Sequence, residues 1–136
     1  MQISIKSRYG LRAMVYLAKA KKTCSAKEIS QKEKIPFDFL EKIFSKLQQH
    51  GLVNSRRGVN GGYLLAKSPR KISIGEILKA LENKEIFQVL CKKKRYPSRK
   101  KCPIREVWEK IKENLNSTLN SITLADLVDK KYAKKK

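Results

Sequence analysis

Histidine and acidic residues, which are common in enzyme active sites, are scarce in this sequence. The 136 residues include one histidine, His50, and 12 aspartates and glutamates. With one histidine, no Ser-His-Asp or Cys-His combination is evident, and no pair of carboxylates stands beside an apolar pocket pattern. The glycines within residues 58–62 follow neither the dinucleotide-binding spacing nor the Walker lysine pattern. We therefore predict that the chain is not an enzyme.

Long apolar segments are also missing. No run of 18 apolar residues occurs, and the N-terminal MQISIKSRYG lacks the apolar core of a signal peptide. We expect a cytoplasmic protein that does not enter a membrane. In that compartment the three cysteines, Cys24, Cys91 and Cys102, are thiols by default and not a disulfide framework.

Basic residues, in contrast, are abundant. Lysine and arginine number 33, and the formal net charge is +21 at pH 7. Both halves of the chain share the excess, which favours a polyanionic partner such as a nucleic acid. An anionic membrane surface is the competing partner, but we find no basic amphipathic helix with a bulky aromatic face. Charge alone leaves open a protein that binds nucleic acids without sequence preference.

Residues 25–50 predict a helix-turn-helix. The spacing Ser25-x-x-Glu28 is a capping box that begins the first helix at Ser25. Pro36 is well suited to the first turn of the second helix, residues 36–50, whose apolar positions Leu40, Ile43, Phe44 and Leu47 repeat with helical spacing. Gly51 follows as a left-handed C-terminal residue. The opposite, polar face of this second helix is what a recognition helix presents to the major groove.

Residues 52–66 predict a β-hairpin directly after these helices, which is the arrangement of a wing. Strands at 52–57 and 63–66 flank a glycine-rich turn, with Arg56 and Arg57 at the tip to enter a minor groove or hold phosphates. The candidate DNA-binding residues from both elements and the nearby basic segments are Lys6, Arg8, Ser25, Asp38, Phe39, Glu41, Lys42, Ser45, Arg56, Arg57, Gly58, Gly61 and Gly62.

Two further helices are expected in the first domain, which we assign to residues 1–82. The first lies within residues 1–22 and has a core face of Leu11, Met14, Val15 and Ala18. The second begins at the capping box Ser73-x-x-Glu76 and turns Ile77, Leu78 and Leu81 inward.

The third domain, residues 104–136, contains the longest periodic segment. An apolar stripe on a helix of about 20 residues is difficult to bury against so small a domain, so we expect it to pair with a second copy in a homodimer. Packing within the chain is the alternative. The expected dimerisation residues are Ile104, Trp108, Ile111, Leu115, Leu119 and Ile122. Thr123-x-x-Asp126 then caps a short last helix.

Residues 83–103 form a basic loop that contains Cys91 and Cys102. Seven of the ten residues between these cysteines are lysine or arginine. The spacing is too long for a zinc knuckle, and two thiolates are fewer than the four ligands of an iron–sulfur cluster. The surrounding charge lowers thiol pKa values, so the pair can serve as a redox sensor, with inert thiols as the alternative.

Several segments together resemble a known family. MQISIKSRYGLRAM, FLEKIFSKLQQHGLVNSRRGVNGGYLL, SIGEILKAL, CPIREVW and SITLADLV are similar to the winged helix-turn-helix bacterial transcription regulators of the IscR/NsrR/CymR family. The resemblance implies a mainly α fold with a small β-hairpin wing and a long dimerisation helix. It also implies a dimeric, sequence-specific DNA-binding regulator, most often a repressor, that reads a pseudo-palindromic operator. Asp38 and Glu41 lie where family members meet bases, and Arg57 holds the place of the minor-groove arginine.

The resemblance also bears on an iron–sulfur cluster. Cluster-binding members use three cysteines in the loop before the long helix, plus a histidine or an acidic residue. Here Cys91 and Cys102 match the outer two cysteines, the middle one is missing, and Arg105 occupies the fourth position. A second family variant takes ligands from the start of the first helix, where this chain has Arg8 and Arg12. We therefore expect no cofactor, with a cluster held by few cysteines, Cys24 among them, as the alternative.

Overall fold

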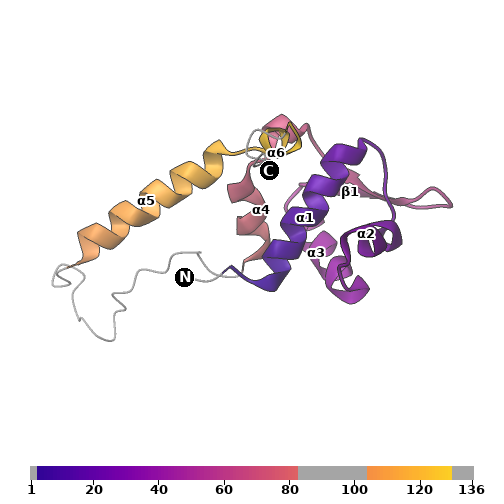
Figure 1. Cartoon of the computed structure of the whole chain (residues 1–136), viewed down its shortest axis with the longest axis horizontal. Helices are drawn as coiled ribbons and strands as arrows, with labels where there is room; N and C mark the ends of the chain where they lie inside the picture. The colour runs from indigo at the N-terminus through magenta and orange to yellow at the C-terminus, as the bar shows by residue number, and fades with distance from the viewer. Residues whose placement is uncertain (1–2, 83–103, 130–136) are drawn as a thin grey trace, which may run out of the picture.

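The computed structural model describes residues 3–82 and 104–129, and confirms a mainly helical fold with a two-stranded wing (Figure 1). Its elements are α1 (Ile5–Ala20), α2 (Ala26–Glu33), α3 (Phe37–Gln49), β1 (Val53–Arg56), β2 (Gly62–Leu65), the 3-10 helix η1 (Pro69–Lys71), α4 (Ile74–Leu81), α5 (Arg105–Ser121) and α6 (Leu124–Val128). Helices α1 to α4 and α6 gather into one body, from which the hairpin and α5 project in different directions. No helix in the described ranges is both long and apolar enough to cross a membrane.

Helix α1 passes through the centre of this body and contacts α2, α3, α4, α6 and β2. Its buried face differs from the predicted one, because Leu11 and Val15 are only half-buried whereas Gly10 and Ala13 are buried. The small residues let α4 approach closely: a Cβ on Gly10 would lie 2.2 Å from Cδ1 of Leu81. A search for large apolar residues at helical spacing overlooks such a contact.

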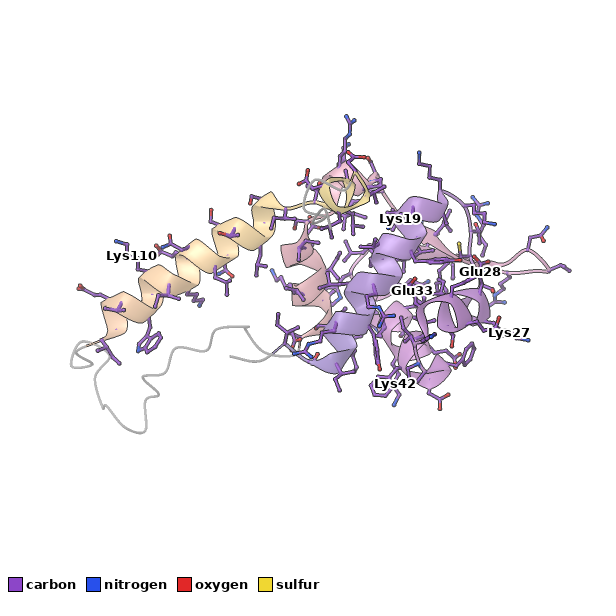
Figure 2. All side chains as sticks on the ribbon, in the orientation of Figure 1. Lys19, Lys27, Glu28, Glu33, Lys42 and Lys110 are labelled. Carbon is purple, nitrogen blue, oxygen red and sulfur yellow. The ribbon has the colours of Figure 1, made fainter. Side chains whose placement is uncertain are left out.

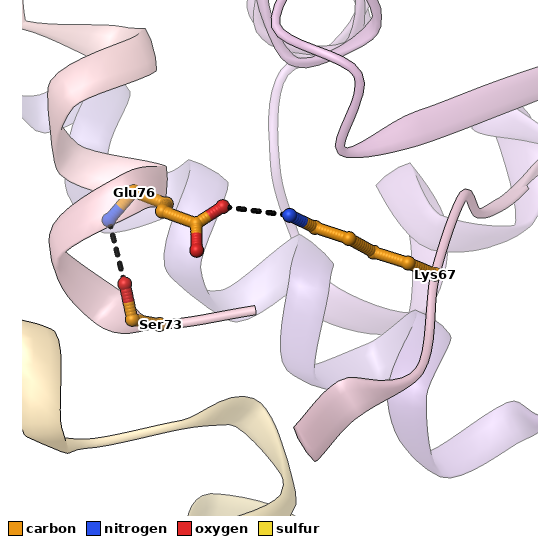
Figure 3. A network of polar contacts seen from close by, with 3 residues as sticks. All are labelled: Lys67, Ser73 and Glu76. Carbon is orange, nitrogen blue, oxygen red and sulfur yellow. Dashed lines mark hydrogen bonds and ion pairs between the residues drawn. The ribbon is translucent and has the colours of Figure 1, made fainter. Parts of the chain in front are cut away.

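The three predicted capping boxes form to different extents. Ser25 and Ser73 each accept a hydrogen bond from the amide three residues later, at 3.0 Å in both cases. The glutamates do not reach back: the hydroxyl of Tyr16 donates to Glu28 at 2.6 Å, and Glu76 binds Lys67 at 3.0 Å (Figure 3). For these two boxes the predicted serine cap is confirmed and the predicted glutamate bond is wrong, because each carboxylate binds a residue outside its helix instead.

The third capping box is complete. The amide of Asp126 donates to the Thr123 hydroxyl at 3.2 Å, and the amide of Thr123 donates to Asp126 at 3.1 Å. This cap begins α6, whose Leu124 is fully buried in the core of the body. The C-terminal segment is thereby anchored on the helix-turn-helix body.

Helix α3 begins one residue later than predicted, at Phe37, with Pro36 as its N-cap. Proline has no side-chain acceptor for the orphan amides, and no side-chain cap forms. At the other end Gly51 has φ 72°, which confirms the predicted left-handed position. The predicted helix-turn-helix is thus present, with its helices at 26–33 and 37–49.

The apolar stripe of α5 is divided between two environments. Leu119 and Ile122 pack against the core of the same chain, and Ile122 follows the end of the helix, where its carbonyl accepts from the amide of Ile74 at 2.8 Å. At the far end, Ile104, Val107 and Ile111 expose 47%, 55% and 37% of their surface. One end of the stripe is therefore buried within the chain, and the other is uncovered.

Candidate nucleic-acid interface

Helix α3 has one face in the core and the other in solvent. Leu40, Ile43, Phe44 and Leu47 are fully buried, whereas the predicted contact residues Asp38, Phe39, Glu41, Lys42 and Ser45 are exposed. Within the described part of the chain, none of the charged groups among them has a hydrogen-bond or ion-pair partner. The charged groups of the outward face are therefore available to a ligand, and Lys42 marks this face in Figure 2.

Two aromatic rings flank the exposed carboxylates at the start of α3. Phe37 and Phe39 expose 44% and 40% of their surface. Tyr9 of α1 meets the ring of Phe39 edge to face, with centroids 5.9 Å apart. The N-terminal end of α1, which carries Lys6 and Arg8, is thus close to the start of α3. Phe37 is a residue that the sequence analysis missed, because its spacing from Leu40 resembles that of a core position.

The predicted wing is an antiparallel hairpin whose register pairs Val53 with Leu65 and Arg56 with Gly62. A hydrogen bond of 3.0 Å from the amide of Gly61 to the carbonyl of Gly58 closes the bend. Exposed Val59 and Asn60 therefore form the tip. Arg56, predicted at the tip, is the last residue of strand β1, and Arg57 follows it at the start of the bend; both are exposed.

Two glycines of the wing are required by its geometry. A Cβ on Gly61 would lie 2.5 Å from the carbonyl oxygen of Arg56. Gly62 has φ 149°, and a Cβ there would lie 2.2 Å from the carbonyl oxygen of Cys24. The hairpin can therefore bend tightly and approach the α1–α2 connection only with glycine at these positions.

Tyr63, next to Gly62, attaches the wing to the body. Its amide donates to the Cys24 carbonyl at 2.8 Å, and the Cys24 amide donates back at 2.9 Å. The Tyr63 ring stacks on Phe44 of α3 with centroids 4.2 Å apart, and Gln48 donates to Ser55 at 3.3 Å. These contacts join the wing to the α1–α2 connection and to the recognition helix, and Cys24 is buried.

Ser25, another predicted contact residue, already has a structural role. Its hydroxyl oxygen accepts the Glu28 amide as the cap of α2, and its side chain is only half-buried. The hydrogen bond from Tyr16 lowers the pKa of Glu28, while the same bond and burial raise the pKa of Tyr16 to about 12. This polar cluster fixes α1 against the start of α2.

The start of α1 is held by a second carboxylate, Glu82. It accepts hydrogen bonds from the Ser4 amide at 3.0 Å, the Ser4 hydroxyl at 2.8 Å and the hydroxyl of the fully buried Ser7. Burial acts to raise the pKa of Glu82, but the bonds from Ser7 and Ser4 outweigh it, and this pKa lies below its ordinary value. The N-terminal turn of α1, which leads to Lys6 and Arg8, is therefore tied to the end of α4.

The family resemblance points to several positions for the ligands of a metal cluster, and arginine occupies some of them. Cys91 and Cys102 lie outside the described residues, and the described ranges contain no group of three histidine, cysteine or acidic residues suited to a metal ion. Arg105 lies 3.9 Å from Glu109, and Arg12 lies 3.5 Å from Glu33 and over the ring of Tyr9. A guanidinium has no lone pair to donate to a metal. Arg105 and Arg12 therefore cannot serve as ligands of a cluster.

The chain is similar to a known protein family over almost its whole length. The sequence profile of the Rrf2 family, described as iron-dependent transcriptional regulators, matches residues 3–130. The chain is 35% identical over 132 residues to the HTH-type transcriptional regulator IscR of Klebsiella pneumoniae (strain 342), covering 95% of this chain and 80% of that protein.

Two solved structures are also similar over nearly the whole chain. CymR of B. subtilis, a global cysteine regulator, is 34% identical with a TM-score of 0.78, covering 98% of this chain and 99% of that one. IscR of T. potens is 33% identical with a TM-score of 0.76, covering 100% and 93%.

Proposed function

The chain belongs to the Rrf2 family of transcriptional regulators, and from this premise we propose that it is a homodimeric repressor of a pseudo-palindromic operator. As a family member it is a DNA-binding regulator of transcription. The observation that carries the proposal is the free outward face of α3 beside a hairpin fixed to the same helix through Tyr63. We assign no catalytic role, and the need to reach the chromosome is our reason to propose action in the cytoplasm.

Readout of sequence is assigned to the start of α3. A carboxylate in the major groove accepts a hydrogen bond from the amino group of cytosine, so Asp38 and Glu41 select for that base and are repelled by phosphates elsewhere. Lys42 and Arg8 are suited to phosphates, which position the protein without selecting a base. Arg57 is proposed to enter the minor groove beside the half-site.

The homodimer is proposed from α5. Ile104, Val107 and Ile111 leave an apolar face uncovered on a helix that projects from the body. A second copy of the same helix would bury it, and a two-fold axis would set two recognition helices about one turn of DNA, ~34–36 Å, or a multiple of it apart.

Selection of bound sequences from a random duplex pool tests the proposal. We expect an inverted repeat with cytosine within each half-site. A pool that stays random after selection would favour binding of nucleic acid by charge alone and would overturn the operator.

A thiol sensor is a second candidate, favoured by the seven basic residues between Cys91 and Cys102. Positive charge stabilises thiolates, and hydrogen peroxide could then oxidise the pair to a disulfide while it is reduced to water. We expect operator binding in a gel shift to respond to peroxide, and Cys91→Ser to remove the response. An unchanged shift would mark both thiols as inert, and iron with a visible absorption band after anaerobic purification would favour a cluster instead.

A further inference from the structure

A cavity of about 280 Å³ lies between the C-terminal end of α1 and strand β2. No residue of α3 lines it, so it is separate from the proposed base-reading surface. We call it the wing-root cavity, and its lining residues are Leu17, Ala18, Lys21, Lys22, Leu64, Leu65, Lys67 and Pro69. Its volume is close to the lower end of the range of small-molecule sites.

The floor of the wing-root cavity is apolar. Leu17 and Ala18 are almost fully buried and belong to the core, and Leu64 and Leu65 form a wall from the wing strand. A hydrocarbon group bound there would remove apolar surface of both the ligand and the cavity from water, which is favourable.

The rim, in contrast, is cationic. Lys21, Lys22 and Lys67 are exposed, and none of the described residues that line the cavity is acidic. Lys21 ends α1 with φ 55°, and its amide donates to the carbonyl of Leu17 at 3.2 Å, so the backbone at the rim is fixed. Neither Lys21 nor Lys22 has an ion-pair partner among the described residues.

The third lysine of the rim has a partner that it can leave. Lys67 binds Glu76 at 3.0 Å, as Figure 3 shows, and the two side chains expose 39% and 42% of their surface. Exposed ion pairs of this kind contribute little free energy, about 0–1 kcal/mol, so a competing anion can attract the ammonium group. The rim thus offers two unpaired cations and a third that can be recruited.

We propose that the wing-root cavity binds a small carboxylate with an apolar body, such as a substituted benzoate or a branched aliphatic acid. The hydrocarbon part would contact Leu17, Leu64 and Leu65, and the carboxylate would pair with Lys21 and Lys22. A bare phosphate gains nothing from the apolar floor, and a neutral molecule gains nothing from the rim. The combination of the two surfaces selects an anion that is also hydrophobic.

Such a ligand would connect the body to the wing. Leu64 and Leu65 directly follow Tyr63, whose bridge to Cys24 attaches the hairpin to the body. A molecule wedged between α1 and β2 that fits one wing position better than another shifts the hairpin and changes operator affinity. This regulatory part rests on the proposed function, whereas the binding itself does not require DNA.

The test uses the full-length chain, labelled with ¹⁵N, and 4-tert-butylbenzoate as the probe. Its neutral analogue 4-tert-butylbenzamide and inorganic phosphate are matched controls. We expect chemical-shift changes at residues 17–22 and 64–67 with a dissociation constant on the order of 1 mM or tighter, and at least about tenfold weaker binding of both controls.

Paired variants test the role of the rim. We expect K21Q/K22Q to weaken the probe at least about fivefold, and K19Q/K27Q, which removes two exposed lysines outside the cavity, to leave it unchanged. Benzamide or phosphate binding as tightly as the benzoate, or shifts centred elsewhere, would overturn the site.

A DNA arm separates the two proposals. We expect K21Q/K22Q to keep operator affinity in the absence of the probe and to remove the effect of the probe on it. If the variant alone loses as much operator affinity as R57A, the rim belongs to the DNA interface and the site is overturned. If the protein has no operator, the proposed regulation fails. The chemical-shift titration then still decides whether the wing-root cavity binds the benzoate.

Discussion

At the scale of single residues, Arg57 bears most of the proposed contact between wing and DNA. It directly follows strand β1 at the start of the bend, and its side chain is exposed, without an ion-pair partner in the described ranges. We predict that R57A weakens operator binding about tenfold to a hundredfold. The slope of log K against log salt concentration should become shallower by about 1, because one cation fewer displaces counterions from the DNA. Fluorescence anisotropy at several salt concentrations measures both. R70A, which removes another exposed arginine, serves as the control. Equal operator affinity of R57A and wild type would contradict the assignment of Arg57.

Glu82 gives a prediction for stability and pH. Its pKa is lowered in the fold, so its stabilising effect is complete above the unfolded-state pKa of about 4.3 and disappears as pH falls through the folded value. We predict that E82Q lowers the free energy of unfolding by about 1–2 kcal/mol at pH 7, because the bonds from Ser4 and Ser7 lose their charge. Protonated Glu82 resembles glutamine, so urea denaturation near pH 3 should show little difference. E41Q changes an exposed carboxylate that has no partner among the described residues, and it should match wild type at both pH values. A pH-independent effect of E82Q would contradict this account.

At the scale of elements, the hairpin depends on its attachment at Gly62. Gly58 and Gly62 both have positive φ, but a Cβ on Gly58 meets nothing within 4 Å. Alanine therefore causes backbone strain at either position and a collision with Cys24 only at Gly62. We predict that G62A lowers the free energy of unfolding by about 2 kcal/mol more than G58A, and that it also weakens operator binding. Denaturant unfolding and anisotropy of both variants are the measurements, and equal losses would show that the wing does not need its bridge to Cys24.

The same elements show what the sequence could predict. Apolar spacing and turn residues located α3, the hairpin and the left-handed Gly51, because those signals are local. The Cys24–Tyr63 bridge and the Tyr63–Phe44 stack could not be found in this way, since they join residues far apart in the chain. For the same reason the sequence could not show that Glu28 binds Tyr16 and Glu76 binds Lys67 instead of closing their capping boxes. Nor could it show that Gly10, and not Leu11, forms the close contact between α1 and α4.

At the scale of the whole molecule, the proposed homodimer depends on α5. V107E places a charge within its uncovered apolar face, whereas N116E places the same charge on the side of the helix directly opposite Val107. We predict that V107E shifts the protein from dimer to monomer in sedimentation velocity while the circular dichroism of the fold is kept, and that N116E stays dimeric. A dimer that V107E leaves intact would assign the interface to another surface.

Sequence-specific binding of DNA by a homodimer is tested most directly by the stoichiometry and the specificity of the complex with the selected duplex. Fluorescence anisotropy titrations at fixed salt, with the selected duplex and with a scrambled one, should give two chains per selected site and a preference of at least about 10³-fold. One chain per site, or equal affinity for both duplexes, would contradict the account.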